Sequence, residues 1–374
     1  MHITRSALRF IALAWLALGL WALPIACGQP AAGPPPRPPR DLTFLVTSDV
    51  HYDAFENEDR NDRTRDTLRH MNEIAGVAWP APLGGDPIRR PRGVLVLGDV
   101  LDDGDRVFQG KVQGAQQWAY YVRDFGFDGT DGLLKYPVFE GVGNHDGPPE
   151  GREKSGFSFQ RELKKRNARR QEKGWLTNLG PGGLHYSWDW DGVHFVQLNL
   201  YPADRQHAAV RYSAAYHDPQ GALTFLKQDL AAHVGASGRP VVLLSHCGFD
   251  TDWWHPDDWR AAYEAAKPYN VILYMYGHTG TGLRQWKPEG EERPLACVNT
   301  GQTENGFFVV QVRQDRLRLA YRVKQWNVTP TEGGRPKKTW TGAWEWKHLL
   351  EKALPAAPPG PLRTAPPAAK AAAP

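Results

Sequence analysis

The segment DLTFLVTSDVHYD, residues 41–53, joins an apolar strand to closely spaced ionisable side chains. Phe44–Val46 supply the apolar run, and Asp49, His51 and Asp53 follow at alternate positions. A strand that leaves a core normally ends in turn residues such as Asp, Asn or Gly. The segment therefore predicts a buried strand that ends either in an ordinary turn or in one half of a binding site.

Strand and helix patterns alternate after this first strand. Apolar runs at 92–99 and 135–146 predict two further strands, and residues 63–79, which Asp62 could cap, and 110–126 predict the helices between them. A βαβαβ order predicts a largely parallel sheet covered on both faces.

The second half of the chain continues with mixed elements. Asp191-Gly192 lies between two alternating runs and predicts a hairpin. Residues 222–234 predict a helix closed by Gly235, and residues 257–267 predict another that ends at Pro268. The predicted strands of this half are 239–246, 270–278, 293–301, 307–314 and 316–326. We predict one α/β domain over residues 41–330, without an internal repeat.

Potential metal ligands recur wherever a predicted strand ends. Each one alone is better explained as a turn residue or a hydrogen-bonded core histidine. In a parallel α/β sheet, however, ligands bind outside the carboxyl ends of the strands, and five strand ends here carry carboxylate, imidazole or amide groups. Together they predict a divalent-metal site built from Asp49, His51, Asp99, Asn144, His145, Asp146, His246 and His278.

The ordered motifs DVH, GDVLD, GNHD, SH and GH, over residues 43–322, resemble those of the calcineurin-like metallophosphoesterases. The resemblance implies an αββα sandwich, in which helices flank two central mixed β-sheets, and a site for two divalent ions such as Mn, Fe or Zn. Asp49 and His51 would bind the first ion, Asp99 would bridge both, and Asn144, His246 and His278 would bind the second. His145 would be the catalytic imidazole, Asp146 would orient it, and Asp102 would lie behind the ligands.

The implied reaction is hydrolysis of a phosphomonoester or phosphodiester. Two metal ions can activate a shared water for in-line attack at phosphorus. His145 could stabilise the developing charge or protonate the leaving group, since imidazole exchanges protons near neutral pH. The alternative from another functional class is a catalytically impaired binding module of the cell envelope that keeps the fold.

Two positions depart from the family pattern. The late motif reads GHTG, so Gly280 stands where the family usually has a second histidine. The first ion would then be held by Asp49, His51 and Asp99 with water, or with Thr281 or Gln302 as a replacement, and we expect weaker binding there. Asp102 stands where purple acid phosphatases carry a tyrosine, which argues against that subclass.

The sequence gives a weaker signal for residues that contact the substrate than for the metal ligands. Tyr52, Asp53, Trp253, Trp254 and His255 adjoin the metal motifs and are candidates, with loop packing as an equal alternative for each. The basic run at Lys164–Arg170 could face a phosphorylated ligand, although such runs more often form a solvated helix face. His194, inside a predicted hairpin strand, is better explained as structural.

The first 40 residues predict export. Residues 1–27 combine Arg5 and Arg9 with an apolar run that ends in LPIAC, which resembles a lipobox with Cys27 as the lipidated residue. Ordinary cleavage near Ala26 and an uncleaved anchor are the alternatives. Residues 28–40 read as a Pro-rich linker, 331–353 as an aromatic extension and 354–374 as a disordered tail. We expect an envelope lipoprotein or a periplasmic or secreted protein.

Bulk charge gives little information about partners. The chain has 374 residues, and 45 basic against 41 acidic side chains leave a net charge of +4. This balance predicts no specific nucleic-acid binding, so we expect a phosphorylated small molecule or a phosphodiester as the ligand. After export only Cys247 and Cys297 remain, and they could pair in an oxidising compartment or stay free and buried.

Overall fold

The first strand is the centre of a six-stranded mixed sheet. In the computed structural model, β1 (Asp41–Thr47) pairs in parallel with β2 (Val94–Val96), and β2 pairs in parallel with β5 (Val138–Glu140). On its other side β1 is antiparallel to β13 (Gly306–Arg313), followed by β14 (Arg316–Thr329) and β15 (Lys337–Ala353). The order is β15-β14-β13-β1-β2-β5.

The structure describes residues 39–54, 58–207, 209–210, 219–330 and 337–354, which belong to one unit that begins at Pro39. The predicted signal peptide, nearly all of the linker and nearly all of the C-terminal tail lie outside these residues and stay predictions. Among the described helices, none combines the length and apolar character that crossing a membrane requires.

A second sheet of seven strands has the order β11-β12-β10-β9-β8-β7-β6. Its parallel centre consists of β8 (Val193–Gln197), β9 (Val241–Leu244), β10 (Val271–Tyr276) and β12 (Leu295–Thr300). Antiparallel strands flank this centre: β6 (Asn178–Leu179), β7 (Tyr186–Trp190) and β11 (Thr281–Trp286). Both sheets are mixed, as the family resemblance implied.

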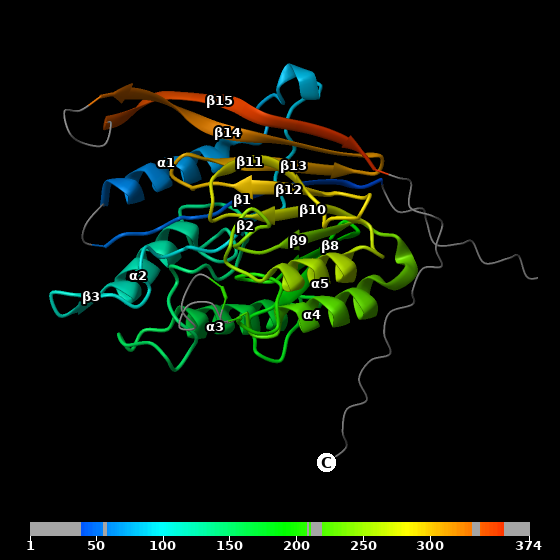
Figure 1. Ribbon diagram of the computed structural model, residues 1–374. Coiled ribbons are helices and arrows are strands. Elements are labelled where there is room, and N and C mark those ends of the chain that lie inside the picture. The colour runs from blue at the N-terminus through cyan, green and yellow to red at the C-terminus, as the bar shows by residue number, and fades with distance from the viewer. Residues whose placement is uncertain (1–38, 55–57, 208, 211–218, 331–336, 355–374) are drawn as a thin grey trace, which may run out of the picture. The chain divides into compact units, whose positions relative to one another are not determined.

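Helices cover one face of each sheet, while the other faces pack together (Figure 1). Apolar residues of both sheets form the central core, including Phe44, Trp188 and Phe195. A second core joins the first sheet to α1 (Glu58–Glu73), α2 (Gln113–Phe125) and α3 (Phe159–Glu172). A third joins the second sheet to α4 (Ala222–Asp229), its continuation η2 (Leu230–Val234) and α5 (Pro256–Ala266). This arrangement confirms the αββα sandwich and corrects the prediction of a single sheet with helices on both faces.

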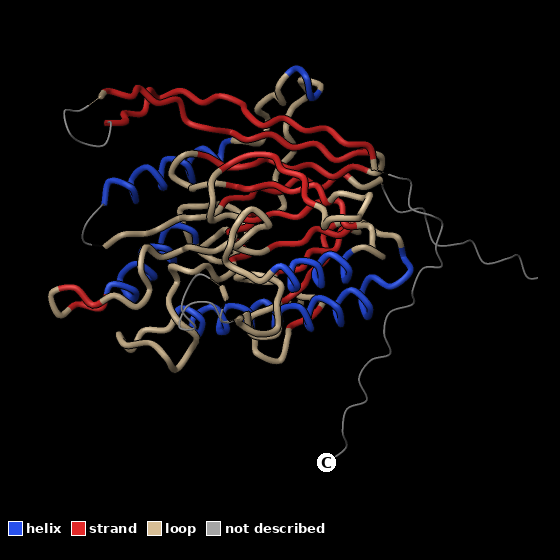
Figure 2. Tube along the Cα trace, viewed as in Figure 1, coloured by secondary structure: helices blue, strands red, loops and turns tan. Residues whose placement is uncertain are grey.

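The smaller elements lie mainly in the connections, which Figure 2 shows in tan. They are η1 (Ala81–Leu83), the β3–β4 hairpin (Val107–Phe108 and Lys111–Val112) and η3 (Gly235–Ser237). The predicted hairpin at Asp191-Gly192 is confirmed, with both residues at positive φ as a tight two-residue turn requires. Helix α1 begins four residues before the predicted cap Asp62, at Glu58.

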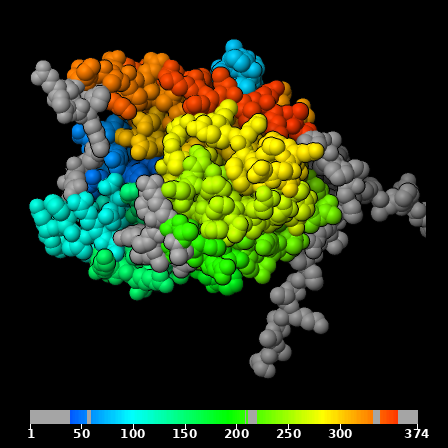
Figure 3. Space-filling view, viewed as in Figure 1, coloured from blue at the N-terminus to red at the C-terminus, as the bar shows by residue number. Residues whose placement is uncertain are grey.

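Strand β15 was not anticipated, because residues 331–353 lack an alternating pattern. Lys337–Ala353 pairs with β14 in the first sheet, and Figure 3 shows this hairpin along one side of the molecule, in orange to red. Val323 lies opposite Gly306, next to the end of β1, so β14 continues beyond β13 on the side where β1 ends. The hairpin therefore reaches the sheet edge at which the metal motifs begin.

The predicted basic run lies on α3 and is neutralised by acids. Arg166 and Arg170 both pair with the fully buried Glu140 at the end of β5, at 2.5 and 2.6 Å. Lys164 pairs with Glu150, and Lys165 with Glu162. Arg166 and Arg170 hold α3 against the sheet through Glu140, and the pairing of the run with acids gives no support to its interpretation as a phosphate-facing surface.

His194 in β8 is held between two carboxylates. Its Nδ1 lies 2.8 Å from Asp189 and its Nε2 lies 2.7 Å from Asp229, and His194 and Asp229 are both fully buried. Burial works to lower the pKa of His194, but the hydrogen bonds to Asp189 and Asp229 outweigh it and raise the pKa above its usual 6.5. The structural reading of His194 agrees with these contacts.

This raised pKa predicts a pH-dependent stability. The stabilisation from His194 is complete below the unfolded-state pKa, near 6.5, and is lost as pH rises through the folded-state value. His194→Ala should lower the unfolding free energy at pH 6 by about 3 to 5 kcal/mol, because Asp229 loses its buried partner. Denaturant titrations at pH 6 and at a series of higher pH values measure this; a penalty that does not shrink as the pH rises would contradict it.

Candidate metal centre

The predicted ligands come from the carboxyl ends of five parallel strands. Asp49 and His51 follow β1, Asp99 follows β2 and Asn144 follows β5 in the first sheet, while His246 and His278 follow β9 and β10 in the second. Several contacts join the sheets at this edge. The amide of His278 donates to the Asp49 carboxylate at 3.0 Å, and Nδ1 of His246 lies 2.7 Å from the Leu97 carbonyl.

The backbone is strained at four of these positions. Asp49, His51, Asp99 and His278 have φ values of 49°, 48°, 49° and 71°, in the left-handed region that non-glycine residues rarely adopt. Such conformations cost about 1 to 3 kcal/mol each and concentrate at functional sites. Their clustering here shows that the rest of the fold holds these four residues in backbone conformations that are unfavourable in free energy.

Glycine permits the close approach of the motif loops. A Cβ at Gly277 would overlap Ser48 and the Asp49 carboxylate, and a Cβ at Gly143 would overlap Asp99. Gly277 of the GH motif therefore lets the second sheet approach the first, and Gly143 of the GNHD motif lets two loops of the first sheet approach each other.

Asp99 is the centre of the cluster. Its Oδ2 lies 3.1 Å from Nε2 of His246 and 3.7 Å from Nε2 of His51, and Asp49 Oδ1 lies 3.8 Å from the same His51 nitrogen. Nε2 of His246 also contacts Asn144 Oδ1 at 2.9 Å. Within the described residues, Asp99 belongs both to a group with Asp49 and His246 and to a group with His51 and His145.

This donor set fits divalent ions. Ligand atoms about 2.0 to 2.2 Å from one ion, at angles near 90° to 120°, lie about 2.8 to 3.8 Å from each other. The distances of 3.1 to 3.8 Å around Asp99 match that spacing, and the donors are the imidazole nitrogens and carboxylate oxygens that Zn, Mn and Fe bind. Asp49, Asp99 and His246 are buried, so their charges need partners within the site.

Electrostatic coupling within the cluster is strong. Burial opposes ionisation of Asp99, but the positive charge of His246 outweighs it and holds the pKa of Asp99 well below its usual range. Burial disfavours the imidazolium of His246, yet Asp99 raises the pKa of His246 to about 9. Burial, followed by the charge of His246, lowers the pKa of His278 to about 4. His278 is therefore neutral at pH 7, the form that binds a metal.

His145 lies at the exposed rim of the cluster. Its amide donates to Asp99 Oδ1 at 2.8 Å, and its ring contacts that of His51 edge to face, with centroids 4.7 Å apart. Nδ1 lies 2.7 Å from the backbone carbonyl of Asp102. A carbonyl only accepts, so Nδ1 carries a proton and Nε2 is the nitrogen left to exchange one.

Asp146 makes contacts other than the predicted one. Its carboxylate accepts from the amides of Leu101 at 2.9 Å and Gly143 at 2.7 Å, and burial together with the charge of Asp99 raises its pKa to about 8. Asp146 thus ties the GDVLD loop to the GNHD loop, and the group that contacts Nδ1 of His145 belongs to Asp102. The Asp102 carboxylate lies 3.7 Å from Nδ1 of His51, one of the candidate ligands.

The candidate substrate residues are mostly enclosed. Tyr52 is fully buried and donates to Asp124 at 2.8 Å, and Trp254 is buried and donates to the Gly248 carbonyl. Trp253 is buried with its ring against that of His278. These three rings pack in the protein and are not exposed for stacking on a ligand. Asp53 is buried with its backbone paired to Asn61, and His255 caps α5.

Gly280 leaves the first site short of one family ligand. Its φ is 133° and a Cβ there would meet no atom within 4 Å, so the backbone conformation favours glycine while space remains around it. Of the two replacements considered, Gln302 pairs with Ser48, directly before Asp49, and its side chain is exposed. Thr281 begins β11 and is half-buried.

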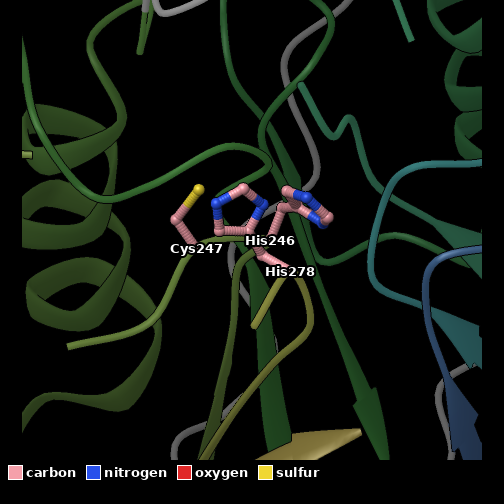
Figure 4. Close-up of side chains that lie close together, drawn as sticks. All are labelled: His246, Cys247 and His278. Carbon is pink, nitrogen blue, oxygen red and sulfur yellow. The ribbon is translucent and has the colours of Figure 1, made fainter. Parts of the chain in front are cut away.

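Cys247 and Cys297 are free and buried, so the predicted alternative of a disulfide is not formed. Cys247 also lies near His246 and His278. Figure 4 shows the imidazole of His246 between the sulfur of Cys247 and the ring of His278.

Two further residues contact the site: Arg60, which the sequence did not single out, and Asn199, which the sequence left undecided. Arg60 on α1 contacts the Asp102 carboxylate at 2.6 Å, and nothing in a charged helical stretch distinguishes it. Asn199, with φ of 59°, accepts from the Val142 amide and through its own carbonyl from the His246 amide. Its position two residues after β8 was the available signal in the sequence.

A protein-family model and several solved structures resemble this chain. The family model for calcineurin-like phosphoesterases matches residues 42–281. Among solved structures, GAP50, the anchor in the inner membrane complex of Plasmodium, has a TM-score of 0.42 at 11% identity and covers 76% of this chain and 85% of its own. The calcineurin-like phosphoesterase YfkN from Bacillus subtilis has a TM-score of 0.38 at 13% identity, covering 84% and 91%.

The 5'-nucleotidase from Candida albicans has a TM-score of 0.35 at 12% identity, with 72% of this chain and 47% of that one covered. No curated protein matches the chain.

Proposed function

This chain belongs to the calcineurin-like phosphoesterase family, and on that premise we propose that it hydrolyses a phosphomonoester or phosphodiester with the help of two divalent metal ions. The observation that carries the proposal is the position of Asp99, whose carboxylate lies between His51 and His246 and also accepts from the His145 amide. A binding protein has no need of such a buried, strained set of charged groups.

Asp49 and His51 would hold the first ion, Asn144, His246 and His278 would hold the second, and Asp99 would contact both. Ions bound in this way supply an activated water and neutralise the charge of the phosphoryl oxygens. The carbonyl of Asp102 fixes the His145 ring through Nδ1. Asp146 fixes the loops on either side through the amides of Leu101 and Gly143.

His145 can complete the reaction by proton transfer. In its protonated form Nε2 donates to the leaving alkoxide as the bond from phosphorus to that oxygen breaks and the bond to the water oxygen forms. The ring is exposed at the rim, so a substrate can reach it, and proton transfer of this kind contributes about 10² to 10⁴-fold to a rate.

The missing ligand at Gly280 predicts unequal metal affinities. Dialysis of the full chain against a chelator should abolish hydrolysis of p-nitrophenyl phosphate and its diester, and Mn²⁺ should restore it. The first ion, with one protein ligand fewer, should return at higher Mn²⁺ concentration than the second, so metal content and activity should rise in two steps. Activity that survives exhaustive chelation, while circular dichroism shows a folded protein, would refute the proposal.

The absence of a ligand at Gly280 also fits a second function. The chain would then be a binding module that has the same fold and has lost catalysis. The two differ in a direct measurement. Hydrolysis by a protein that carries two ions supports the enzyme, whereas folded protein that binds no divalent ion supports the module.

A further inference from the structure

We propose that Arg60, at the start of α1, binds the phosphoryl group of the substrate. The inference rests on the proposed function of the metal centre and adds a residue that no motif indicates. Nη1 of Arg60 donates to Asp102 Oδ1 at 2.6 Å and reaches the His51 carbonyl at 3.4 Å. The guanidinium therefore contacts both the residue that orients His145 and the first-site ligand His51.

The guanidinium has donor capacity beyond these contacts. Arginine carries five N–H donors in a planar fork that matches phosphate oxygens. The two contacts of Arg60 both involve Nη1, and its Nε is buried without a hydrogen-bond acceptor in the described part of the chain. The side chain as a whole is 22% exposed, so it lies between the protein interior and the open rim.

The first turns of α1 are fastened to the site, which fixes Arg60. Asn61 exchanges two hydrogen bonds with the backbone of Asp53, just after His51. Arg63 pairs with Glu304 at 2.6 Å, and Lys324 on the β14 extension donates to the carbonyls of Arg63 and Glu304. A positive group held in this way needs little reordering when an anion binds.

Charge favours an anionic ligand at this position. Arg60 lies close to groups that would hold divalent cations, and like charges at such distances repel. The single Asp102 carboxylate offsets part of this repulsion, and a phosphoryl group, with up to two negative charges, would offset more. Arg166 and Arg170 of the basic run on α3 are not available to bind a phosphoryl group, because both are paired with Glu140.

The competing explanation is that Arg60 only supports Asp102 and thereby His145. The two roles predict different effects of an Asp102 substitution on phosphate binding. Asp102→Asn removes the carboxylate and leaves the guanidinium free for phosphate. If Arg60 is only a support, Asp102→Asn and Arg60→Ala should weaken phosphate binding equally.

The test uses the metal-loaded full chain and inorganic phosphate as the probe. Calorimetry should show about 10- to 100-fold weaker phosphate binding for Arg60→Ala, a smaller loss for Arg60→Lys, and a change of less than about threefold for Asp102→Asn. With p-nitrophenyl phosphate, Arg60→Ala should raise KM by a similar factor. Metal content should not fall, because a neighbouring positive charge is removed.

Arg69→Ala is the matched control, since this exposed arginine of the same helix pairs only with Asp66 among the described residues. Its phosphate affinity should equal that of the wild type. Phosphate affinity of Arg60→Ala within twofold of wild type, or an equal loss in Asp102→Asn, would overturn the inference. Failure of the wild type to hydrolyse any phosphoester would instead refute the proposed function, and the phosphate measurements would still decide the role of Arg60.

Discussion

Asp99→Asn is expected to abolish phosphoester hydrolysis and to remove most of the bound metal. Asp99 Oδ2 is the carboxylate oxygen that approaches both His246 and His51. Leaving a buried positive group without its partner costs about 3 to 5 kcal/mol, which corresponds to roughly a hundredfold to several-thousandfold weaker binding. Elemental analysis and turnover of p-nitrophenyl phosphate measure the two losses together.

The asparagine keeps the shape of Asp99 and can still accept from the His145 amide, so the fold should survive. Asp62→Asn is a suitable control, because Asp62 is an exposed acid on α1 that pairs with Arg65. It should keep metal and activity. Two tightly bound ions in Asp99→Asn would show that Asp99 does not connect the two sites.

His145→Ala should reduce turnover by about 10² to 10⁴-fold while the metal content stays that of the wild type. The ring lies at the rim and contacts the ring of His51 edge to face, so its removal should leave the buried carboxylates of the cluster in place. The loss should be larger for an alkyl phosphate than for p-nitrophenyl phosphate, because a poor leaving group depends more on protonation. Steady-state kinetics at saturating Mn²⁺ compare the two substrates.

A near-wild-type rate for His145→Ala with the alkyl substrate would rule out a role in leaving-group protonation. Equal losses for both substrates would point to charge stabilisation as the remaining role of the imidazole. The metal content of the variant must also be measured. Loss of an ion would lower the rate for every substrate, so an unchanged metal content shows that the change in rate comes from loss of the imidazole.

Sequence reasoning could select the candidate ligands because each follows an apolar strand. Asp49, Asp99, His246 and His278 stand where a buried run ends, and parallel strands deliver their carboxyl ends to one edge. The hairpin at Asp191-Gly192 could also be predicted from the sequence, because a two-residue turn has a strong local sequence pattern.

Other features depended on tertiary contacts that local sequence does not encode. Strand β15 lacks alternation because much of it is exposed, and only its pairing with β14 defines it as a strand. Tyr52 and Trp254 adjoin the motifs in sequence, yet their rings turn into the core. Arg60 reaches Asp102 across a separation of 42 residues, and the hydrogen bonds of Asp146 go to backbone amides, which no residue pattern reveals.

The most direct test of the central claim is the number of divalent ions bound per chain, measured by elemental analysis of purified, Mn²⁺-loaded wild-type protein alongside its phosphoesterase turnover. We predict two ions per chain together with hydrolysis of p-nitrophenyl phosphate or its diester. A folded protein that binds no divalent ion and hydrolyses neither substrate would contradict the assignment of a dinuclear phosphoesterase centre around Asp99.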